Sequence, residues 1–349
     1  MDELHDMRVL SLFDGISCAR VAIAKMGVKN VDYHASEIDR PAMHIAMANW
    51  PDTLQVGDVT KVDGTAYKGK LDLLIGGSPC QDLSIAQKNR KGLDGNRSGL
   101  FWEYVRILRE AKPKYFVLEN VASMSKDAKH IITETLGVEP SMIDAALVSA
   151  QRRKRLFWTN IPRIKLPEDR GIFLKDILQK GMEMDLPKNY IKWLNSPSGQ
   201  RRIEKGFIKI NPDKAKGLMA RDYAAWNGNL VLQYRRTYWR ETKGGKVPTL
   251  TANMGTGGHN VPFIEQTGRG KNAGGKKYGK VPTLSASSWE HNHKLNGVRK
   301  LTPVECERLQ SLPDGYTATV SDTQRYKALG NAFNTEVVRH ILSHIPDLK

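Results

Sequence analysis

Residues 71–76 have the sequence Leu-Asp-Leu-Leu-Ile-Gly, a mostly apolar run that ends in glycine. A short run of this kind is typical of a strand that is covered on both faces, as in a parallel sheet. Further apolar runs and amphipathic stretches alternate along the first 160 or so residues: Arg8–Phe13, Ile16–Met26, Val31–Glu37, Arg40–Trp50, Leu100–Glu110 and Tyr115–Glu119. This alternation predicts an α/β fold built on a doubly wound, mostly parallel sheet.

A first candidate ligand site follows the predicted strands, since ligands bind at the carboxyl ends of strands in such sheets. The segment Phe13-Asp14-Gly15-Ile16-Ser17 opens a helix but lacks the three glycines of a dinucleotide site, which disfavours NAD. Glu37 is placed to accept hydrogen bonds from a ribose diol, and Asp58 could accept one from an adenine amine. A strand followed by glycine and an acid is commonplace, so these residues alone suggest a nucleoside site without establishing it.

A cysteine directly follows the buried strand, in the sequence Gly76-Gly77-Ser78-Pro79-Cys80-Gln81. A free cysteine is more often a small buried apolar residue than a nucleophile. Here the position at a strand end, the glycine-containing loop at residues 82–98 and the basic residues of that loop favour a reactive thiol. Cys80 is therefore the candidate nucleophile.

Two further segments carry polar residues toward the same site. Glu119-Asn120-Val121 ends the next predicted strand, so Glu119 should reach the same edge of the sheet as Cys80. The run Gln151-Arg152-Arg153-Lys154-Arg155 precedes an apolar strand at Leu156–Thr159. Strand alternation would send Gln151, Arg153 and Arg155 to one face and the other two residues to the opposite face. A solvated run of charges is an equally good interpretation of this segment by itself.

The positive charge of the chain is concentrated in one region. Of a formal net charge of +17 over 349 residues, residues 165–300 contribute an excess of 15, with 26 Lys and Arg against 11 Asp and Glu. A clustered basic excess favours a polyanionic partner, and nucleic acid is favoured over a solvated basic surface. No basic amphipathic helix stands out, so a membrane surface is disfavoured as the partner.

The cysteine count and the absence of an apolar span limit the class of protein. Cys18, Cys80 and Cys306 are far apart and form no Cys-x-x-Cys pair, which argues against a disulfide framework and against a zinc site. No run of 18 or more apolar residues occurs, and the first residues are acidic rather than basic and apolar. We expect a cytoplasmic protein without a structural or catalytic metal.

The strand-and-helix rhythm is lost from about Ile164, where Gly, Lys and Pro become frequent. The hexapeptide Gly-Lys-Val-Pro-Thr-Leu occurs twice there, at Gly245–Leu250 and Gly279–Leu284. Helical periodicity returns at Val304–Leu312 and Val337–Ile345. We therefore expect a first domain at 1–164, a loop-rich insertion at 165–295 and a C-terminal segment at 296–349 that returns to the first domain.

Taken together, these motifs resemble those of the DNA (cytosine-5) methyltransferase family, in the family's order and from Arg8 to the C-terminus. The resemblance rests on Ser78-Pro79-Cys80-Gln81, Glu119-Asn120-Val121 and Gln151-x-Arg153-x-Arg155. It extends to Arg299–Pro303 with the residues that follow, and to Gly330-Asn331-Ala332. It implies a Rossmann-like methyltransferase fold in which residues 165–295 form the target-recognition domain.

The resemblance also implies roles for particular residues. S-adenosylmethionine would be the cofactor, and Cys80 would attack C6 of a cytosine flipped out of duplex DNA. Glu119, Arg153 and Arg155 would complete the catalytic set, with Glu119 bonding N3 and the exocyclic amine and Arg155 neutralising O2. The expected cofactor residues are Phe13, Asp14, Gly15, Glu37, Ile38, Asp58, Pro79, Leu100, Asn331 and Ala332. The expected DNA contacts are Gln81, Ser84, Arg97, Gln151, Thr249, Leu250, Thr283 and Leu284.

Two residues depart from the family pattern, because Ser17 stands where a second glycine is usual and Phe333 where a smaller aliphatic residue is common. The compact length is more like that of a bacterial or phage enzyme. We expect a monomer that acts on double-stranded DNA, with a cognate restriction endonuclease as a candidate partner. Of the two Thr-Leu pairs, Thr249-Leu250 is favoured as the base reader, because the glycine-rich stretch after it allows close backbone approach.

Three other functions remain as alternatives. An RNA cytosine methyltransferase would use a similar site, but the large basic insertion favours a reader of DNA. A catalytically silent DNA-binding relative is disfavoured because Cys80, Glu119 and Arg155 are all present. A nicotinamide dehydrogenase would lack its glycine fingerprint and would leave the basic insertion unexplained.

Overall fold

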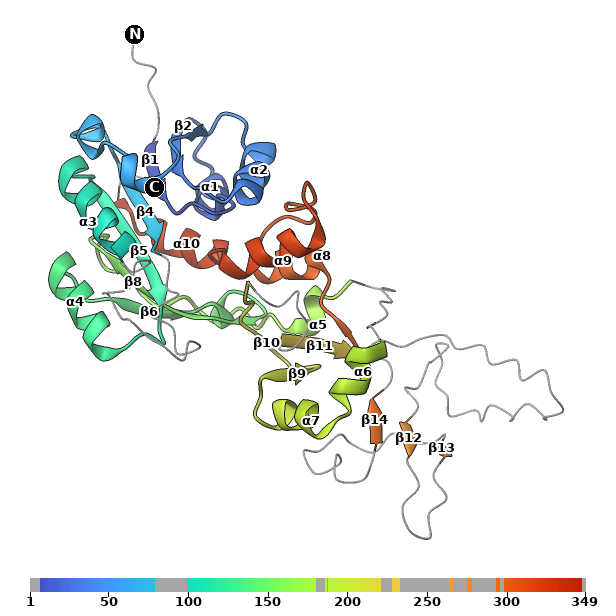
Figure 1. Cartoon of the computed structure of the whole chain (residues 1–349). Coiled ribbons are helices and arrows are strands. Elements are labelled where there is room, and N and C mark those ends of the chain that lie inside the picture. The colour runs from blue at the N-terminus through green and yellow to red at the C-terminus, as the bar shows by residue number, and fades with distance from the viewer. Residues whose placement is uncertain are drawn as a thin grey trace. The chain divides into compact units, whose positions relative to one another are not determined.

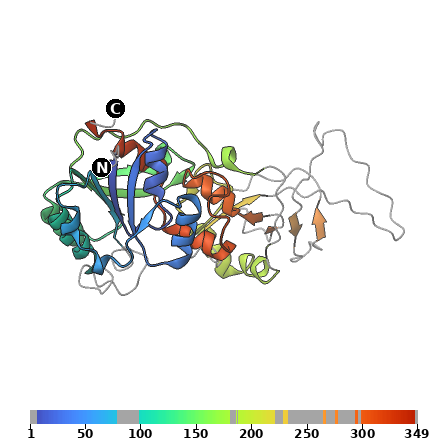
Figure 2. The same cartoon turned by 90° about the horizontal axis from the view of Figure 1, so that it is seen from above.

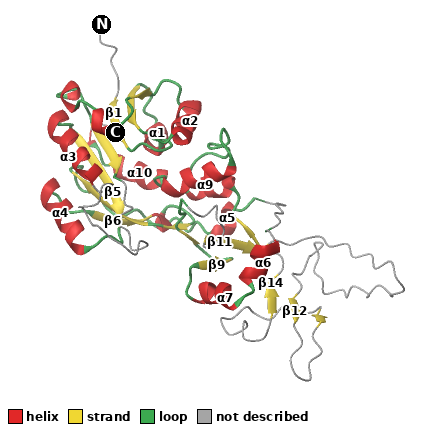
Figure 3. Ribbon diagram, in the orientation of Figure 1, coloured by secondary structure: helices red, strands yellow, loops and turns green. Residues whose placement is uncertain are grey.

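The computed structural model describes residues 7–78, 99–179, 186, 188–220, 228–232, 264–266, 275–277, 293–295 and 298–346 (Figures 1 and 3). The chain divides into two compact units. Unit 1 comprises Met1–Ile177, Asp213–Tyr223 and Pro303–Lys349, and unit 2 comprises Leu178–Pro212 and Ala224–Thr302. Each unit is therefore discontinuous in sequence.

Unit 1 is built on a seven-stranded sheet with the order β3-β2-β1-β4-β5-β8-β6. Its strands are β1 (Met7–Leu12), β2 (Val31–Ser36), β3 (Leu54–Gln55), β4 (Leu73–Gly77), β5 (Tyr115–Val121), β6 (Ser141–Asp144) and β8 (Lys154–Thr159). The first five strands of that order pair in parallel, whereas β8 is antiparallel to both β5 and β6. The predicted doubly wound, mostly parallel sheet is thus confirmed. Its order reverses between β1 and β4, the position at which such sheets bind ligands.

Helices cover both faces of this sheet (Figures 1 and 2). One face packs against α1 (Cys18–Ala24) and α10 (Thr335–Leu342) through alternate strand residues such as Val9, Ile75 and Val117. The opposite face packs against α3 (Gly99–Ala111) and α4 (Lys126–Leu136) through the intervening residues, such as Leu10 and Leu74. Alternation along each strand sends neighbouring side chains to opposite faces, so strands buried on both sides need the apolar runs seen in the sequence.

The remaining elements of unit 1 connect or extend this core. They are α2 (Arg40–Asn49), the 3₁₀ helices η1 (Val59–Lys61), η2 (Gly64–Tyr67) and η4 (Ala145–Leu147), β7 (Gln151–Arg152), α5 (Leu174–Ile177), β10 (Ala215–Lys216), α8 (Pro303–Leu309) and α9 (Asp322–Asn331). The apolar stretch at Val337–Ile345 does return to the sheet, since α10 contributes Val337 and Ile341 to the core of one face. Neither α4 nor α9 was predicted, because both carry many polar residues and have few buried positions.

The boundaries of the two units differ from the expected division of the chain into residues 1–164, 165–295 and 296–349. Residues 165–177 and 213–223 belong to unit 1, because the amide of Leu174 donates to the carbonyl of Asp213 and β10 pairs with β7. Residues 298–302 belong to unit 2, because β15 (Val298–Lys300) pairs with β11 (Gly228–Leu232). Hydrogen bonds between segments distant in sequence set these boundaries, and composition carries no trace of them.

Unit 2 has a small core of its own. A three-stranded sheet with the order β15-β11-β9 includes β9 (Ile208–Ile210), and α6 (Lys188–Leu194) and α7 (Pro197–Glu204) accompany it. Buried Tyr190, Leu194, Ile208 and Leu230 form its apolar cluster. A second sheet of three short strands pairs β13 (Gly275–Lys277) and β14 (His293–Leu295) with β12 (Ile264–Gln266). Within the part of the chain that the structure describes, none of the helices has the length and apolar character needed to cross a membrane.

Candidate active site

A cavity of about 320 Å³ lies in unit 1 at the carboxyl ends of β1, β2, β4 and β5. Its walls include every predicted cofactor residue that the structure describes: Phe13, Asp14, Gly15, Glu37, Ile38, Asp58, Leu100, Asn331 and Ala332. The three described catalytic candidates, Glu119, Arg153 and Arg155, line it as well. A mostly apolar wall with a few acidic groups, in a cavity of this size, fits a nucleoside-type cofactor.

The loop after β1 has a strained backbone that a buried carboxylate holds in place. Phe13 and Ser17 have positive φ angles of 57°, a conformation that favours glycine, and Gly15 between them has a φ of 62°. Asp14 accepts hydrogen bonds from the Ser17 hydroxyl at 2.5 Å and the Tyr33 hydroxyl at 2.7 Å. Burial raises the pKa of Asp14. Ser17 thus combines a glycine-like conformation with a hydrogen bond that a glycine could not make.

Glu37 joins the loops that follow β1 and β2. Its carboxylate accepts from the amide of Gly15 at 2.8 Å, and from the amides of Ile38 and Asp39 at 2.7 Å and 2.8 Å. A carboxylate offers about four acceptor sites, so these three bonds leave acceptor capacity toward the cavity. Glu37 therefore sets the shape of the cavity wall and can also accept from a ligand hydroxyl.

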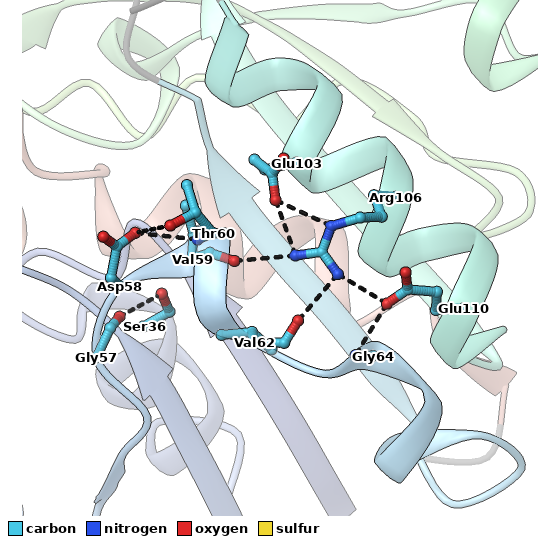
Figure 4. Close-up of polar contacts among 10 residues, drawn as sticks. All are labelled: Ser36, Gly57, Asp58, Val59, Thr60, Val62, Gly64, Glu103, Arg106 and Glu110. Carbon is cyan, nitrogen blue, oxygen red and sulfur yellow. Dashed lines mark hydrogen bonds and ion pairs between the residues drawn. The ribbon is translucent and has the colours of Figure 1, made fainter.

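Asp58, which also lines the cavity, caps the short helix η1 (Figure 4). One of its oxygens, Oδ1, accepts from the amide of Thr60 at 3.0 Å and from the Thr60 hydroxyl at 2.9 Å. These bonds lower the pKa of Asp58. Among the described residues, its Oδ2 accepts no hydrogen bond, so this oxygen is available to a ligand amine.

An ion pair joins Glu119 of β5 and Arg155 of β8 in the wall of the cavity. Arg155 Nε lies 2.7 Å from Oε1 of Glu119, and the two side chains are 21% and 13% exposed. Glu119 pairs with Gly77 across the β4–β5 ladder, so it stands beside the end of β4. Within the described chain, Glu119 Oε2 and Arg155 Nη2 have no hydrogen-bond partner. A carboxylate oxygen and a guanidinium N–H therefore remain for a substrate in a partly dry site.

Arg153 and Gln151 are held by other parts of unit 1. The buried Arg153 guanidinium donates to the carbonyl of Leu218 at 2.9 Å and to those of Gly330 and Ala332 at 3.1 Å and 3.0 Å. The fully buried Gln151 amide donates to the carbonyl of Leu309 at 3.1 Å and accepts from the amide of Leu218 at 2.8 Å. The bonds from Arg153 position the C-terminal end of α9, where Asn331 and Ala332 lie. The predicted alternation is confirmed, because Gln151 and Arg153 are buried whereas Arg152 and Lys154 are exposed.

The remaining predicted site residues lie outside the described part of the chain, and their roles stay predictions. They are Pro79, Cys80, Gln81, Ser84, Arg97, Thr249, Leu250, Thr283 and Leu284.

One important wall residue, Phe333, appeared in the sequence only as a departure from the family pattern. It lines the cavity, and its ring lies so close to β4 that a Cβ atom at Gly77 would be 2.7 Å from Phe333 Cε1. The same Cβ would be 3.1 Å from Oε2 of Glu119. The bulk of Phe333 is therefore accommodated by the absence of a side chain at Gly77, a pairing of residues that only the fold brings together.

Comparison with known proteins identifies the family. Residues 7–347 match the C-5 cytosine-specific DNA methylase family. The orphan methyltransferase M.SPRI of Bacillus phage SPR is 28% identical over 97% of each chain. The type II methyltransferase M.Bsp6I of Bacillus sp. (strain RFL6) is 26% identical over 97% of this chain and 98% of its own.

Solved structures share the fold. The Entamoeba histolytica methyltransferase EhMeth superposes with a TM-score of 0.68 at 15% identity, over 98% of this chain and 99% of its own. The S. pombe Dnmt2 methyltransferase gives a TM-score of 0.61 at 17% identity, over 97% of each chain. The chain belongs to the C-5 cytosine-specific DNA methylase family, whose members are S-adenosylmethionine-dependent DNA (cytosine-5) methyltransferases.

Proposed function

We propose that this protein transfers a methyl group from S-adenosylmethionine to C5 of a cytosine flipped out of duplex DNA, through a covalent bond between Cys80 and C6. The observation that carries the proposal is the Glu119–Arg155 ion pair in the wall of the cavity, beside the end of β4. Cys80 follows Gly77 by three residues, and three residues of chain span at most about 11 Å. We therefore propose that the Cys80 thiol acts beside this ion pair.

The chemistry requires groups of these kinds. C5 of cytosine is a poor nucleophile, and addition of a thiolate to C6 turns C5 into an enamine carbon. The addition places negative charge on N3 and O2. We assign to Glu119 the hydrogen bonds to N3 and the exocyclic amine, and to Arg155 the neutralisation of O2. After C5 has taken the methyl group, a base, which we take to be water, removes the C5 proton, and the C6–S bond breaks to release the Cys80 thiolate.

The cofactor residues divide by chemistry. When bound, S-adenosylmethionine would supply an electrophilic methyl group on a sulfonium, and loss of that methyl would leave the thioether S-adenosylhomocysteine as the product. Glu37 accepts from the ribose diol and Oδ2 of Asp58 from the adenine amine, while Phe13, Ile38 and Leu100 supply apolar surface. Asn331 and Ala332 close the cavity from the C-terminal end of α9, which Arg153 holds.

The DNA side of the reaction falls to the insertion and to the loop after Cys80. We assign target recognition to unit 2, which holds most of residues 165–295, phosphate contacts to its Lys and Arg residues, and base contacts to Thr249 and Leu250. Extrusion of the base costs a few kcal/mol, which the contacts to the deformed duplex offset. The enzyme would act as a monomer on DNA in the cytoplasm of a bacterial or phage-infected cell, with a cognate restriction endonuclease as a candidate partner.

Covalent trapping tests this function without knowledge of the target sequence. A duplex in which 5-fluorocytosine replaces cytosine is incubated with the protein and S-adenosylmethionine, and adducts are resolved on a denaturing gel. Fluorine cannot leave as a proton does, so the adduct should persist. Cys80→Ala should form none, whereas Cys306→Ala, which changes a buried cysteine of α8, should form as much as the wild type.

The outcomes separate the alternatives. An adduct with Cys80→Ala would remove this cysteine as the nucleophile. Methylation of transfer RNA but not of duplex DNA in a labelling assay would favour the RNA enzyme. Binding of duplex without an adduct or methyl transfer would indicate a silent DNA-binding relative. Bisulfite sequencing of genomic DNA after incubation would then report the target site.

A further inference from the structure

The guanidinium of Arg106, on α3, makes an unusually complete set of hydrogen bonds (Figure 4). It donates to Oε2 of Glu103 from Nε and Nη2, at 2.9 Å and 2.8 Å, and to Oε2 of Glu110 from Nη1 at 2.8 Å. It also donates to the carbonyl of Val59 at 3.1 Å and to that of Val62 at 2.9 Å. An arginine has five N–H donors, and all five are engaged here.

The carbonyl acceptors lie in the irregular segment at residues 57–64, which contains η1. The Ser36 hydroxyl donates to the carbonyl of Gly57 at 2.7 Å, which ties the start of the segment to β2. The amide of Gly64 donates to Oε2 of Glu110 at 3.0 Å, which ties its end to α3. Arg106 holds the stretch between these two anchors, so α3 fixes the backbone of η1 through one side chain.

This segment forms part of the cavity wall, because both Asp58 and Val59 line the cavity. Asp58 immediately precedes Val59, whose carbonyl accepts a hydrogen bond from Arg106. We propose that Arg106 is a positioning residue for the cofactor, which keeps Asp58 and Val59 in the geometry that binds the adenine end. The inference rests on the proposed function, which places the adenine amine at Asp58.

The network is suited to positioning rather than to holding the fold together. The side chains of Arg106, Glu103 and Glu110 are 33%, 27% and 29% exposed, and ion pairs at this exposure contribute little to global stability. The apolar face of α3, with Phe101, Tyr104 and Ile107, anchors the helix independently. Loss of Arg106 should therefore change the affinity for the cofactor more than the unfolding temperature.

The choice of arginine follows from the geometry of the acceptors. The two carbonyls belong to residues 59 and 62, and the two carboxylates come from the turns of α3 before and after Arg106. A planar guanidinium can reach all four groups at once, whereas the ammonium of a lysine is a single point with three donors. Arg106→Lys should keep the charge and lose part of the positioning.

Calorimetric titration with S-adenosylhomocysteine tests this inference without turnover. We expect Arg106→Leu to weaken binding by about tenfold, and Arg106→Lys by less, since a misplaced Asp58 loses a hydrogen bond to a charged group. Arg109→Leu, which changes an exposed arginine of the same helix, should bind within about twofold of the wild type. Hydrogen exchange at the amides of residues 58–64 should accelerate in Arg106→Leu, less in Arg106→Lys and not in Arg109→Leu. The unfolding temperature of Arg106→Leu should stay within a few degrees of the wild type.

Each failure has a distinct meaning. If the wild type did not bind S-adenosylhomocysteine, the proposed function would be wrong and the role of Arg106 would fall with it. If the wild type bound and Arg106→Leu bound equally well, the function would stand and the positioning role would be refuted. A large fall in unfolding temperature in both Arg106 variants, with unchanged exchange at residues 58–64, would make Arg106 a stabilising residue of α3.

Discussion

Glu336 is the centre of an ion-pair network that holds α10 against other parts of unit 1. Its Oε1 accepts from Lys25 Nζ at 3.0 Å, just after α1. Its Oε2 accepts from Arg170 Nη1 at 2.9 Å and from Arg339 Nε at 3.0 Å. Burial opposes ionisation of Glu336, but these three cations outweigh it and lower its pKa from 4.5 to about 2. Glu336→Gln keeps the shape of the side chain and removes the charge.

The shift in pKa sets the expected loss of stability. At about 1.4 kcal/mol per unit, it corresponds to an upper bound of about 3 kcal/mol. The side chains of Lys25 and Arg170 are 34% and 40% exposed, so screening reduces the expected free-energy loss at pH 7 to about 1–2 kcal/mol. Because the pKa is lowered in the folded state, this stabilisation is present above about pH 4.5 and is lost as the pH falls toward 2.

Urea unfolding at several pH values measures this effect. The difference in free energy of unfolding between the wild type and Glu336→Gln should be largest at pH 5–7 and shrink steadily below pH 4.5. Glu134→Gln, a change at an exposed position of α4, should show no such dependence. A difference that stayed constant down to the lowest pH at which the protein folds would refute the electrostatic reasoning, and so would the absence of any difference at pH 7.

Three further changes probe the site. Gly77→Ala should lower turnover by roughly 10-fold to 100-fold, because its Cβ would lie 2.7 Å from Phe333 Cε1 and 3.1 Å from Glu119 Oε2. Adding Phe333→Leu should restore part of the turnover, and the steric explanation fails if it does not. Glu119→Gln should lower turnover by roughly 100-fold with little change in duplex affinity by filter binding, so an unchanged turnover would make Glu119 structural. Tyr33→Phe removes the buried donor to Asp14 and should cost about 1–3 kcal/mol in urea unfolding, whereas a neutral change would mean that water replaces the hydroxyl.

The longer strands β1, β2, β4, β5 and β8 and most helices of unit 1 were predictable because their signals are local, whereas the short strands β3, β6, β7 and β10 were not predicted. β1, β2, β4 and β5 lie within a residue or two of the predicted runs. β1, β4 and β5 are mostly buried, and strands buried on both faces must be apolar wherever they lie in the fold. The polar helix α9 was missed for the converse reason, because few of its side chains are buried and its pattern is faint. A helix or strand can be predicted from apolar periodicity only where enough of its side chains are buried.

By itself the sequence determined the fold class, the family and the short motifs that surround the cavity, because each depends on residues close together in the chain. Only the tertiary structure decided which side chains meet. The ion pair of Glu119 with Arg155 depends on the antiparallel pairing of β5 with β8. The hydrogen bond from Arg106 to the carbonyl of Val59 depends on the packing of α3. Such contacts depend on strand register and on the closure of long loops, and neither leaves a periodic pattern in the sequence.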